Sequence, residues 1–203
     1  MAEEATAVPS IDSSLFVTVS GPPGCGATTL CEHLSEAMGC PYVSGGEVFR
    51  ELAADRDMSL NQLTAKADET DEIDRALDGR LRSIAEKWGA TNKPFILESR
   101  LAGWIAGNRA DLRIWLDAPE EVREQRIRDR EETTWEMRVR EVSEVGRYES
   151  YYEIDLEDRV FYDLQLNTAR WGKAAVFGIV REAIEAYDPE ADEGAFETDP
   201  PAV

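Results

Sequence analysis

Short apolar runs alternate along this chain with longer stretches in which apolar residues recur every three or four positions. Short apolar runs are typical of buried strands, and the three-to-four spacing is typical of helices with one buried face. The pattern predicts strands over residues 15–19, 41–43, 95–98, 113–117 and 162–167. Because helical segments separate these strands, we expect an α/β fold, a parallel sheet with crossover helices.

The clearest helical stripe covers residues 73–88. Its predicted apolar face consists of Ile73, Leu77, Leu81, Ile84 and Trp88. Its predicted polar face carries Asp74, Arg75, Asp78 and Arg82. A second stripe predicts a closing helix and consists of Val176, Val180, Ala183 and Tyr187.

The two ends of the chain lack such patterns. Residues 188–203 contain six acids, three prolines and no base, a composition typical of disorder. We therefore expect one domain over residues 14–187, a flexible extension over residues 1–13 and an acidic disordered tail over residues 188–203.

The net charge of the chain limits the kinds of partner that it can bind. The 42 acidic residues exceed the 22 basic ones, giving a formal net charge of −20, which disfavours binding to nucleic acid and to anionic membranes. Acid excess combined with only four lysines suggests a salt-rich cytosol, where the Debye length falls to about 3 Å at molar salt. Any bound phosphate must then be met by local positive charge.

Cysteine content and hydropathy place the protein in the cytoplasm. The three cysteines are odd in number, no secretory signal precedes them, and no apolar run approaches the ~18 residues that a membrane span needs. We expect reduced thiols and a soluble protein. Cys25 follows a glycine just before a predicted helix, where a lowered pKa is one interpretation and small-residue packing is the favoured one.

The segment SGPPGCGATT, residues 20–29, resembles a phosphate-binding loop between a strand and a helix. The P-loop pattern is G-x-x-x-x-G-K-[ST], and Gly21, Gly26 and Thr28 are in register with it. Ala27 stands where the pattern requires lysine. An ordinary Gly/Pro turn is the alternative interpretation.

The chemistry of phosphate binding favours the interpretation of this segment as a phosphate-binding loop. Glycines let backbone N–H groups approach an anion at a helix N-terminus. We expect the donor phosphates to lie on Gly21, Pro22, Pro23, Gly24, Cys25, Gly26, Ala27, Thr28 and Thr29. The Thr28 hydroxyl is placed to bind Mg²⁺, and Glu98 to hold that ion through water.

Several motifs occur in one order along the chain: SGGEVFR (44–50), ESRLAGW (98–104), RIRDRE (126–131) and REVSEVGRYESYYEID (140–155). With LFVTVSGPPG before them, DEIDRALDGR between them and YDLQLNT after them, the chain resembles the archaeal type of cytidylate kinase from about residue 14 to 187. The resemblance implies a three-layer P-loop nucleoside monophosphate (NMP) kinase fold with a five-stranded parallel sheet. It also implies an NMP-binding insertion over about 44–88 and a mobile lid over about 131–152.

The same resemblance implies an activity and its residues. A monomer would transfer the γ-phosphate of ATP, with Mg²⁺, to CMP or dCMP. The positions that match the acceptor site are Ser44, Arg50 and Arg100. The arginines that match those closing over the transferring phosphoryl group are Arg126, Arg130, Arg140 and Arg147. The loop over residues 168–173 would lie against the adenine.

Ala27 leaves alternatives open. Loss of one preorganised electrostatic partner lowers the rate of other enzymes by about 10² to 10³. We hypothesise that a lid arginine, first Arg126 or Arg130, supplies the missing charge. Arginines at i,i+4 from an acid, such as Arg128 and Arg140, also fit ordinary solvated helix pairs. A nucleotide-binding protein without turnover, and a kinase for another nucleoside monophosphate, are the alternative functions.

Overall fold

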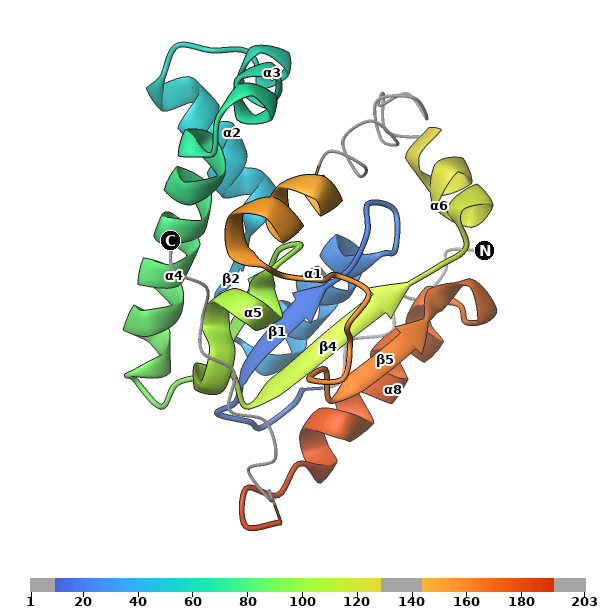
Figure 1. Cartoon of the computed structure of the whole chain (residues 1–203). Coiled ribbons are helices and arrows are strands. Elements are labelled where there is room, and N and C mark those ends of the chain that lie inside the picture. Colours follow the sequence, from blue (N-terminus) through green and yellow to red (C-terminus); the bar gives the residue numbers. More distant parts are fainter. Residues whose placement is uncertain (1–9, 129–143, 192–203) are drawn as a thin grey trace, which may run out of the picture.

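The computed structural model describes residues 10–128 and 144–191. Its centre is a five-stranded sheet in the order β2-β3-β1-β4-β5, in which every pairing is parallel (Figure 1). The strands are β1 (Phe16–Ser20), β2 (Tyr42–Ser44), β3 (Phe95–Glu98), β4 (Leu112–Asp117) and β5 (Leu164–Asn167). The sequence-based expectation of a five-stranded parallel α/β sheet is confirmed.

β3 has the predicted bounds, and the bounds of the other four strands differ from the predicted ones by one or two residues. The largest difference is in β5, which begins at Leu164 rather than at residue 162. The Tyr162 N–H bonds to the Arg159 carbonyl, so the backbone before β5 is still turning. Tyr162 is buried beside Trp115 and Phe161 in an aromatic cluster. A buried aromatic residue just before a strand has the same sequence pattern as a strand residue, so the predicted strand began too early.

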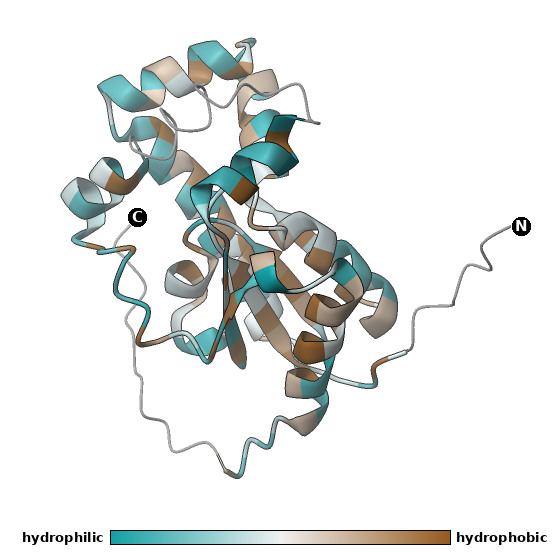
Figure 2. Ribbon diagram, turned by 90° about the vertical axis from the view of Figure 1, so that its right-hand side faces the viewer, coloured by the Kyte–Doolittle hydropathy of each residue, from teal (hydrophilic) through white to brown (hydrophobic). Residues whose placement is uncertain are grey.

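Helices cover both faces of the sheet. On one face α1 (Ala27–Met38) and α8 (Lys173–Ala186) share an apolar cluster with the central strands. On the other face α4 (Glu72–Gly89) and α5 (Ala102–Ala106) form a second cluster with β3. Figure 2 shows the strands as largely hydrophobic ribbons between helices in which hydrophilic and hydrophobic residues alternate. Burial of the strands on both faces explains their continuous apolar runs.

Further elements lie around this core. The chain adds α2 (Gly45–Asp55), α3 (Leu60–Glu69), α6 (Glu120–Ile127) and two single turns of 3₁₀ helix, η1 (Gly107–Arg109) and η3 (Thr168–Arg170). A helix also covers residues 144–152, the described part of the predicted lid. Within the described ranges, no helix combines the length and the apolar character needed to cross a membrane.

The segment from α2 to α4 projects from one end of the sheet (Figure 1). It has a small apolar cluster of its own, built around Leu52, Leu63 and Ile73. A capping box between Ser59 and Gln62 starts α3. This segment corresponds to the predicted NMP-binding insertion.

The prediction for the polar face of α4 was partly wrong. Asp74 and Asp78 are only 3% and 2% exposed. The reason is tertiary: the helix over residues 144–152 covers that side of α4, where Tyr152 donates to Asp78 Oδ2 at 2.8 Å. Periodicity within α4 cannot reveal a covering helix some 70 residues further along the chain.

The excess of acids leads to a prediction about stability. We expect the unfolding midpoint to rise as KCl is increased from about 0.1 M to molar concentrations, because salt screens the repulsion among charges that sum to −20. Each kcal/mol gained corresponds to about 2–4 °C in a chain of this size. Calorimetric melting in KCl, with sucrose as a non-ionic control, measures the effect. A midpoint that responds to sucrose alone would contradict it.

Candidate nucleotide-binding site

The predicted phosphate loop lies at the carboxyl edge of the sheet, between the end of β1 and the start of α1. In parallel α/β sheets, ligands bind at this edge. The register places Ser44 of β2 beside Glu98 of β3, and Glu98 beside Val19 of β1. The sheet therefore brings the end of β2 and the end of β3 next to the loop.

Two glycines of the loop are required by close contacts. A Cβ at Gly21 would lie 2.3 Å from the Leu116 carbonyl oxygen. A Cβ at Gly24, which has a φ of +80°, would lie 2.8 Å from the Arg123 carbonyl oxygen. The loop is thus packed against β4 on one side and against α6 on the other.

The start of α1 is suited to binding an anion. Gly26 is its N-cap, in the left-handed region at φ 99°, and no side chain in the described part of the chain caps the first turn. N–H groups of an uncapped first turn are available to a phosphate, which the helix dipole also favours. Ala27, the first residue of α1, contributes only a methyl group at the position where the P-loop pattern has lysine.

Thr28 and Glu98 form a pair suited to a divalent cation. The Thr28 hydroxyl donates to Glu98 Oε1 at 2.9 Å, and Glu98 Oε2 is buried without a hydrogen-bond partner among the described residues. Burial raises the pKa of Glu98, whereas hydrogen bonds from Thr28 and Ser44 lower it. A hydroxyl beside a carboxylate with an unused oxygen fits Mg²⁺, which takes few protein ligands and is bound largely by water and substrate phosphates.

Cys25 has a packing role. Its side chain is 2% exposed, and burial raises its pKa to about 11. The thiol is therefore protonated at neutral pH. Of the two interpretations of Cys25, the structure favours packing.

Two arginines of α6 reach the loop. Arg126 Nη1 donates to the Gly24 carbonyl at 3.1 Å and to the Thr168 hydroxyl at 2.9 Å, and its Nη2 donates to the Thr168 carbonyl at 3.1 Å. Arg123 Nη1 donates to the Pro23 carbonyl at 3.1 Å. The sequence analysis singled out Arg126 and missed Arg123, whose only signal was an arginine at i−3 from Arg126.

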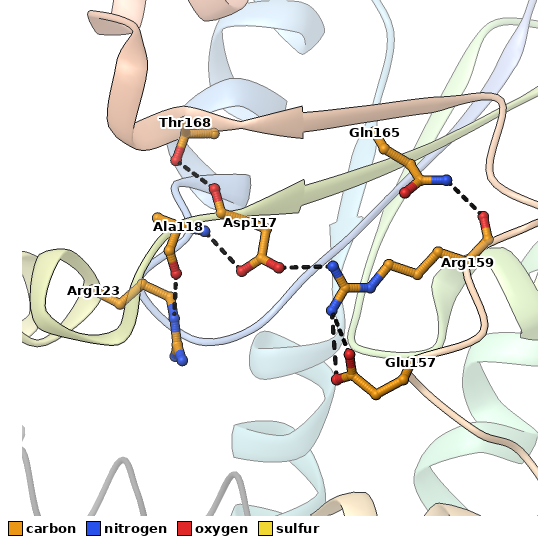
Figure 3. A network of polar contacts seen from close by, with 7 residues as sticks. All are labelled: Asp117, Ala118, Arg123, Glu157, Arg159, Gln165 and Thr168. Carbon is orange, nitrogen blue, oxygen red and sulfur yellow. Dashed lines mark hydrogen bonds and ion pairs between the residues drawn. The ribbon is translucent and has the colours of Figure 1, made fainter.

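A polar network extends from this region along β4 and β5. Arg123 donates to the Ala118 carbonyl, and Arg159 pairs with Asp117 at 2.8 Å (Figure 3). The Thr168 hydroxyl lies 3.1 Å from the Asp117 carbonyl. Thr168 is 4% exposed and begins η3, so the loop predicted to meet the adenine is anchored to the end of β4.

The predicted acceptor residues lie beyond β2 and β3. Ser44 is buried at the N-cap of α2, and Arg50 is exposed on the same helix. Arg100 follows β3, and its side chain is 11% exposed. Arg100 Nε lies 3.7 Å from Glu144 Oε2, and its guanidinium carbon lies 5.9 Å from the centroid of the Trp115 ring.

Of the other arginines assigned by resemblance, Arg130 and Arg140 lie outside the described residues. Arg147 contacts the insertion: its Nη1 pairs with Asp68, and its Nε lies 2.7 Å from Asp74 Oδ2. The helix over residues 144–152 therefore binds the insertion through Arg147 as well as through Tyr152. Through Glu144, the same helix also contacts Arg100, which follows β3.

Asp78 gives a pH-dependent prediction. Burial raises its pKa to about 7, although the hydrogen bond from Tyr152 lowers it. Because the pKa of Asp78 is higher in the folded protein, the folded state binds this proton more tightly than the unfolded chain does. The contribution of Asp78 to the free energy of unfolding is therefore fully present below its pKa in the unfolded chain, and it is lost as the pH rises through about 7. We therefore expect Asp78→Asn to be more stabilising at pH 8 than at pH 5, by about 1–3 kcal/mol. Urea unfolding at both pH values measures this difference.

The baseline for that comparison is Glu69→Gln, at an exposed position of α3. Asparagine keeps an oxygen that accepts from Tyr152, so the hydrogen bond itself is retained. Equal effects of Asp78→Asn at pH 8 and pH 5 would show that Asp78 ionises normally in the folded protein.

Solved structures share this fold. Shikimate kinase from Bacteroides thetaiotaomicron aligns with a TM-score of 0.57 at 15% identity, covering 84% of this chain and 98% of that one. A gluconokinase from Sinorhizobium meliloti aligns with a TM-score of 0.53 at 16% identity, covering 88% and 91%. These similarities show a fold that is also found in P-loop kinases.

Sequence relatives are closer. A family model described as an AAA domain matches residues 17–149. Proteins named cytidylate kinase are 50% identical in Haloquadratum walsbyi, over 90% of this chain and 95% of the relative, and 48% identical in Halobacterium salinarum, over 89% and 94%. One from Thermococcus sibiricus is 41% identical over 89% of this chain and 93% of its own length. This chain belongs to the cytidylate kinase family.

Proposed function

We propose that this protein transfers the γ-phosphoryl group of Mg·ATP to CMP or dCMP, giving ADP and CDP or dCDP. The observation that carries the proposal is the Thr28–Glu98 pair beside an uncapped helix N-terminus, in a chain of the cytidylate kinase family. Phosphoryl transfer needs alignment and positive charge more than covalent chemistry from the protein. The site supplies backbone donors on one side and arginines on the other.

Each part of the site has a role in this proposal. Residues 21–29 hold the donor phosphates. Thr28 would hold Mg²⁺ directly and Glu98 would hold it through water, and such an ion would supply positive charge to the phosphates. Ser44 and Arg50 meet the acceptor nucleotide, and Arg100 meets its phosphate, because a guanidinium fork matches phosphate geometry.

The lid arginines complete the positive charge. We propose that Arg130, Arg140 and Arg147 approach the transferring group when nucleotides bind. Arg126, whose guanidinium binds the Gly24 carbonyl and Thr168, acts on the loop rather than on the transferring group. Arg147 is paired with Asp68 and Asp74. It must exchange those carboxylates for phosphate, so its action depends on closure. The protein acts as a cytoplasmic monomer in this proposal.

Ala27 supports a second candidate, a nucleotide-binding protein with little or no turnover. The loop keeps its backbone donors without the ammonium group that would follow charge from the β- to the γ-phosphate. The retained arginines favour the kinase, because a protein that only binds nucleotide has little use for cations around a transferring group.

The experiment is ADP formation by the purified protein with Mg·ATP at high KCl. CMP, dCMP, UMP and AMP are compared as acceptors, and a reaction without acceptor is the control. Turnover that requires CMP or dCMP supports the proposal. Tight ATP binding by calorimetry without turnover on any acceptor would support the second candidate, and preference for UMP or AMP would change the substrate.

A further inference from the structure

Arginines of α6 bind three successive carbonyl groups of the phosphate loop. Arg123 binds the Pro23 carbonyl at 3.1 Å, and Arg126 binds those of Gly24 and Cys25 at 3.1 and 3.4 Å. All three hydrogen bonds come from two side chains of one helix. The carbonyl side of the loop therefore faces α6.

The orientation of the carbonyls sets that of the N–H groups. In a trans peptide the C=O and N–H groups point in opposite directions. Carbonyls fixed toward α6 thus turn the following N–H groups, those of Gly24, Cys25 and Gly26, away from it. The Cys25 N–H closes a turn onto the Pro22 carbonyl at 3.1 Å. The N–H groups of Gly24 and Gly26 are left facing the side where a phosphate binds.

The contact between loop and helix is tight. A Cβ at Gly24 would lie 2.9 Å from Arg123 Cβ as well as close to the Arg123 carbonyl, so there is no room for a larger residue between them. Arg123 is 7% exposed, and its Nε donates to the Ala118 carbonyl at 3.0 Å. The Arg123 side chain is therefore held in place from both ends of its guanidinium group.

Arg126 also brings charge. Its hydrogen-bond partners are neutral carbonyl and hydroxyl oxygens, and no carboxylate among the described residues forms an ion pair with it. Guanidinium groups stay protonated in proteins. Within residues 10–128 and 144–191, Arg126 is therefore a cation without an ion-pair partner, directly behind a loop that lacks its lysine.

Arg126 further joins the two halves of the donor site. It binds both Thr168 oxygens, and the Thr168 hydroxyl lies 2.7 Å from the Cys25 carbonyl. One side chain thereby connects the phosphate loop with the segment after β5. A change at Arg126 must then affect the loop without removing any group that touches the γ-phosphate.

We propose that Arg123 and Arg126 are positioning residues that keep the phosphate loop in its anion-binding conformation and carry the affinity for ATP that Ala27 does not supply. The inference rests on the proposed ATP-dependent function. It assigns these arginines to the binding of the donor triphosphate. In this inference, other groups, on the opposite side of the nucleotide, accelerate phosphoryl transfer.

Arg126→Gln is the first test. Glutamine keeps a donor and removes the charge and the fork. Hydrogen bonds from charged groups contribute about 1.5–3 kcal/mol, so we expect the Kd of ATP to rise about 10- to 100-fold by calorimetry. We expect kcat at saturating ATP to change less than about threefold, because uniform binding is what is lost. Arg126→Lys, which restores the charge without the fork, should recover only part of the affinity.

Arg128→Gln is the matched control, since Arg128 is exposed at the end of the same helix. It should leave the Kd of ATP unchanged. Should Arg126→Gln fail to fold, Thr168→Val replaces it, because valine keeps the volume and removes the hydroxyl that Arg126 binds. We expect about a three- to tenfold weaker Kd from that variant, at the lower end of one hydrogen bond.

The outcomes separate the inference from the proposed function. An unchanged Kd of ATP in folded Arg126→Gln overturns the inference, as does a fall in kcat of more than tenfold at unchanged Kd. Equal losses in Arg126→Gln and Arg128→Gln would also overturn it, because position on the loop would not matter. ATP binding without turnover in the natural protein would remove the proposed activity while leaving the binding test intact.

Discussion

Ala27→Lys is expected to raise kcat for CMP phosphorylation by about 10²- to 10³-fold. An ammonium group at the first position of α1 would reach the β- and γ-phosphates and stabilise the charge that moves between them. The arginines of α6 bind the loop carbonyls, so they cannot follow that charge. Steady-state ADP formation with Mg·ATP and CMP at high KCl measures the gain.

Ala27→Met is the matched control, because it adds similar length without charge. We expect methionine to leave kcat within about threefold of the natural protein, the range of a minor packing change. An unchanged kcat in Ala27→Lys, with ATP bound normally, would mean that another cation already occupies the position of the missing ammonium. The arginines of the lid would then be the groups to replace next.

Arg100→Ala is expected to lower kcat/KM for CMP by about 10²-fold or more, with the Kd of ATP unchanged. Arg100 follows β3 two residues after Glu98, and its side chain is 11% exposed. Loss of one buried charged partner of a ligand costs about 2–5 kcal/mol. Kinetics at varied CMP, together with calorimetry of ATP, separate the two nucleotide sites.

Glu144 complicates this result, since it lies 3.7 Å from Arg100 and would be left without that partner. The double variant Arg100→Ala/Glu144→Gln also removes the negative charge of the Glu144 carboxylate, which faces Arg100. We expect it to recover stability and not activity. Recovery of CMP turnover in the double variant would show that Arg100 serves folding rather than the acceptor phosphate. Arg100→Lys should retain part of the activity, both with the natural Glu144 and with Glu144→Gln.

Sequence patterns predicted correctly those features that depend on a single strand or loop. The five strands follow from apolar runs, since each strand of a parallel sheet is buried on both faces. The turn over residues 21–28 follows from glycine spacing, because its shape is a property of the local backbone. The match of the motifs around Glu98 and Arg147 carried the family, which the relatives show.

Contacts between distant segments were beyond these patterns. Asp74 and Asp78 were expected on a solvated face and are buried, because residues 144–152 pack over them. Arg123 carried no motif. Its importance depends on α6 meeting the loop at Gly24, about a hundred residues away in the chain.

The sequence by itself determined the α/β class, the phosphate loop and its missing lysine, because these depend on residue type and local spacing. Only the tertiary structure decided which cations lie behind the loop and which carboxylates lose their solvent. Those properties arise where separate helices meet, and an arginine or aspartate has the same local signature in a solvated helix as in a buried contact. The effect of Ala27 on activity therefore depends on which side chains surround it in the folded protein.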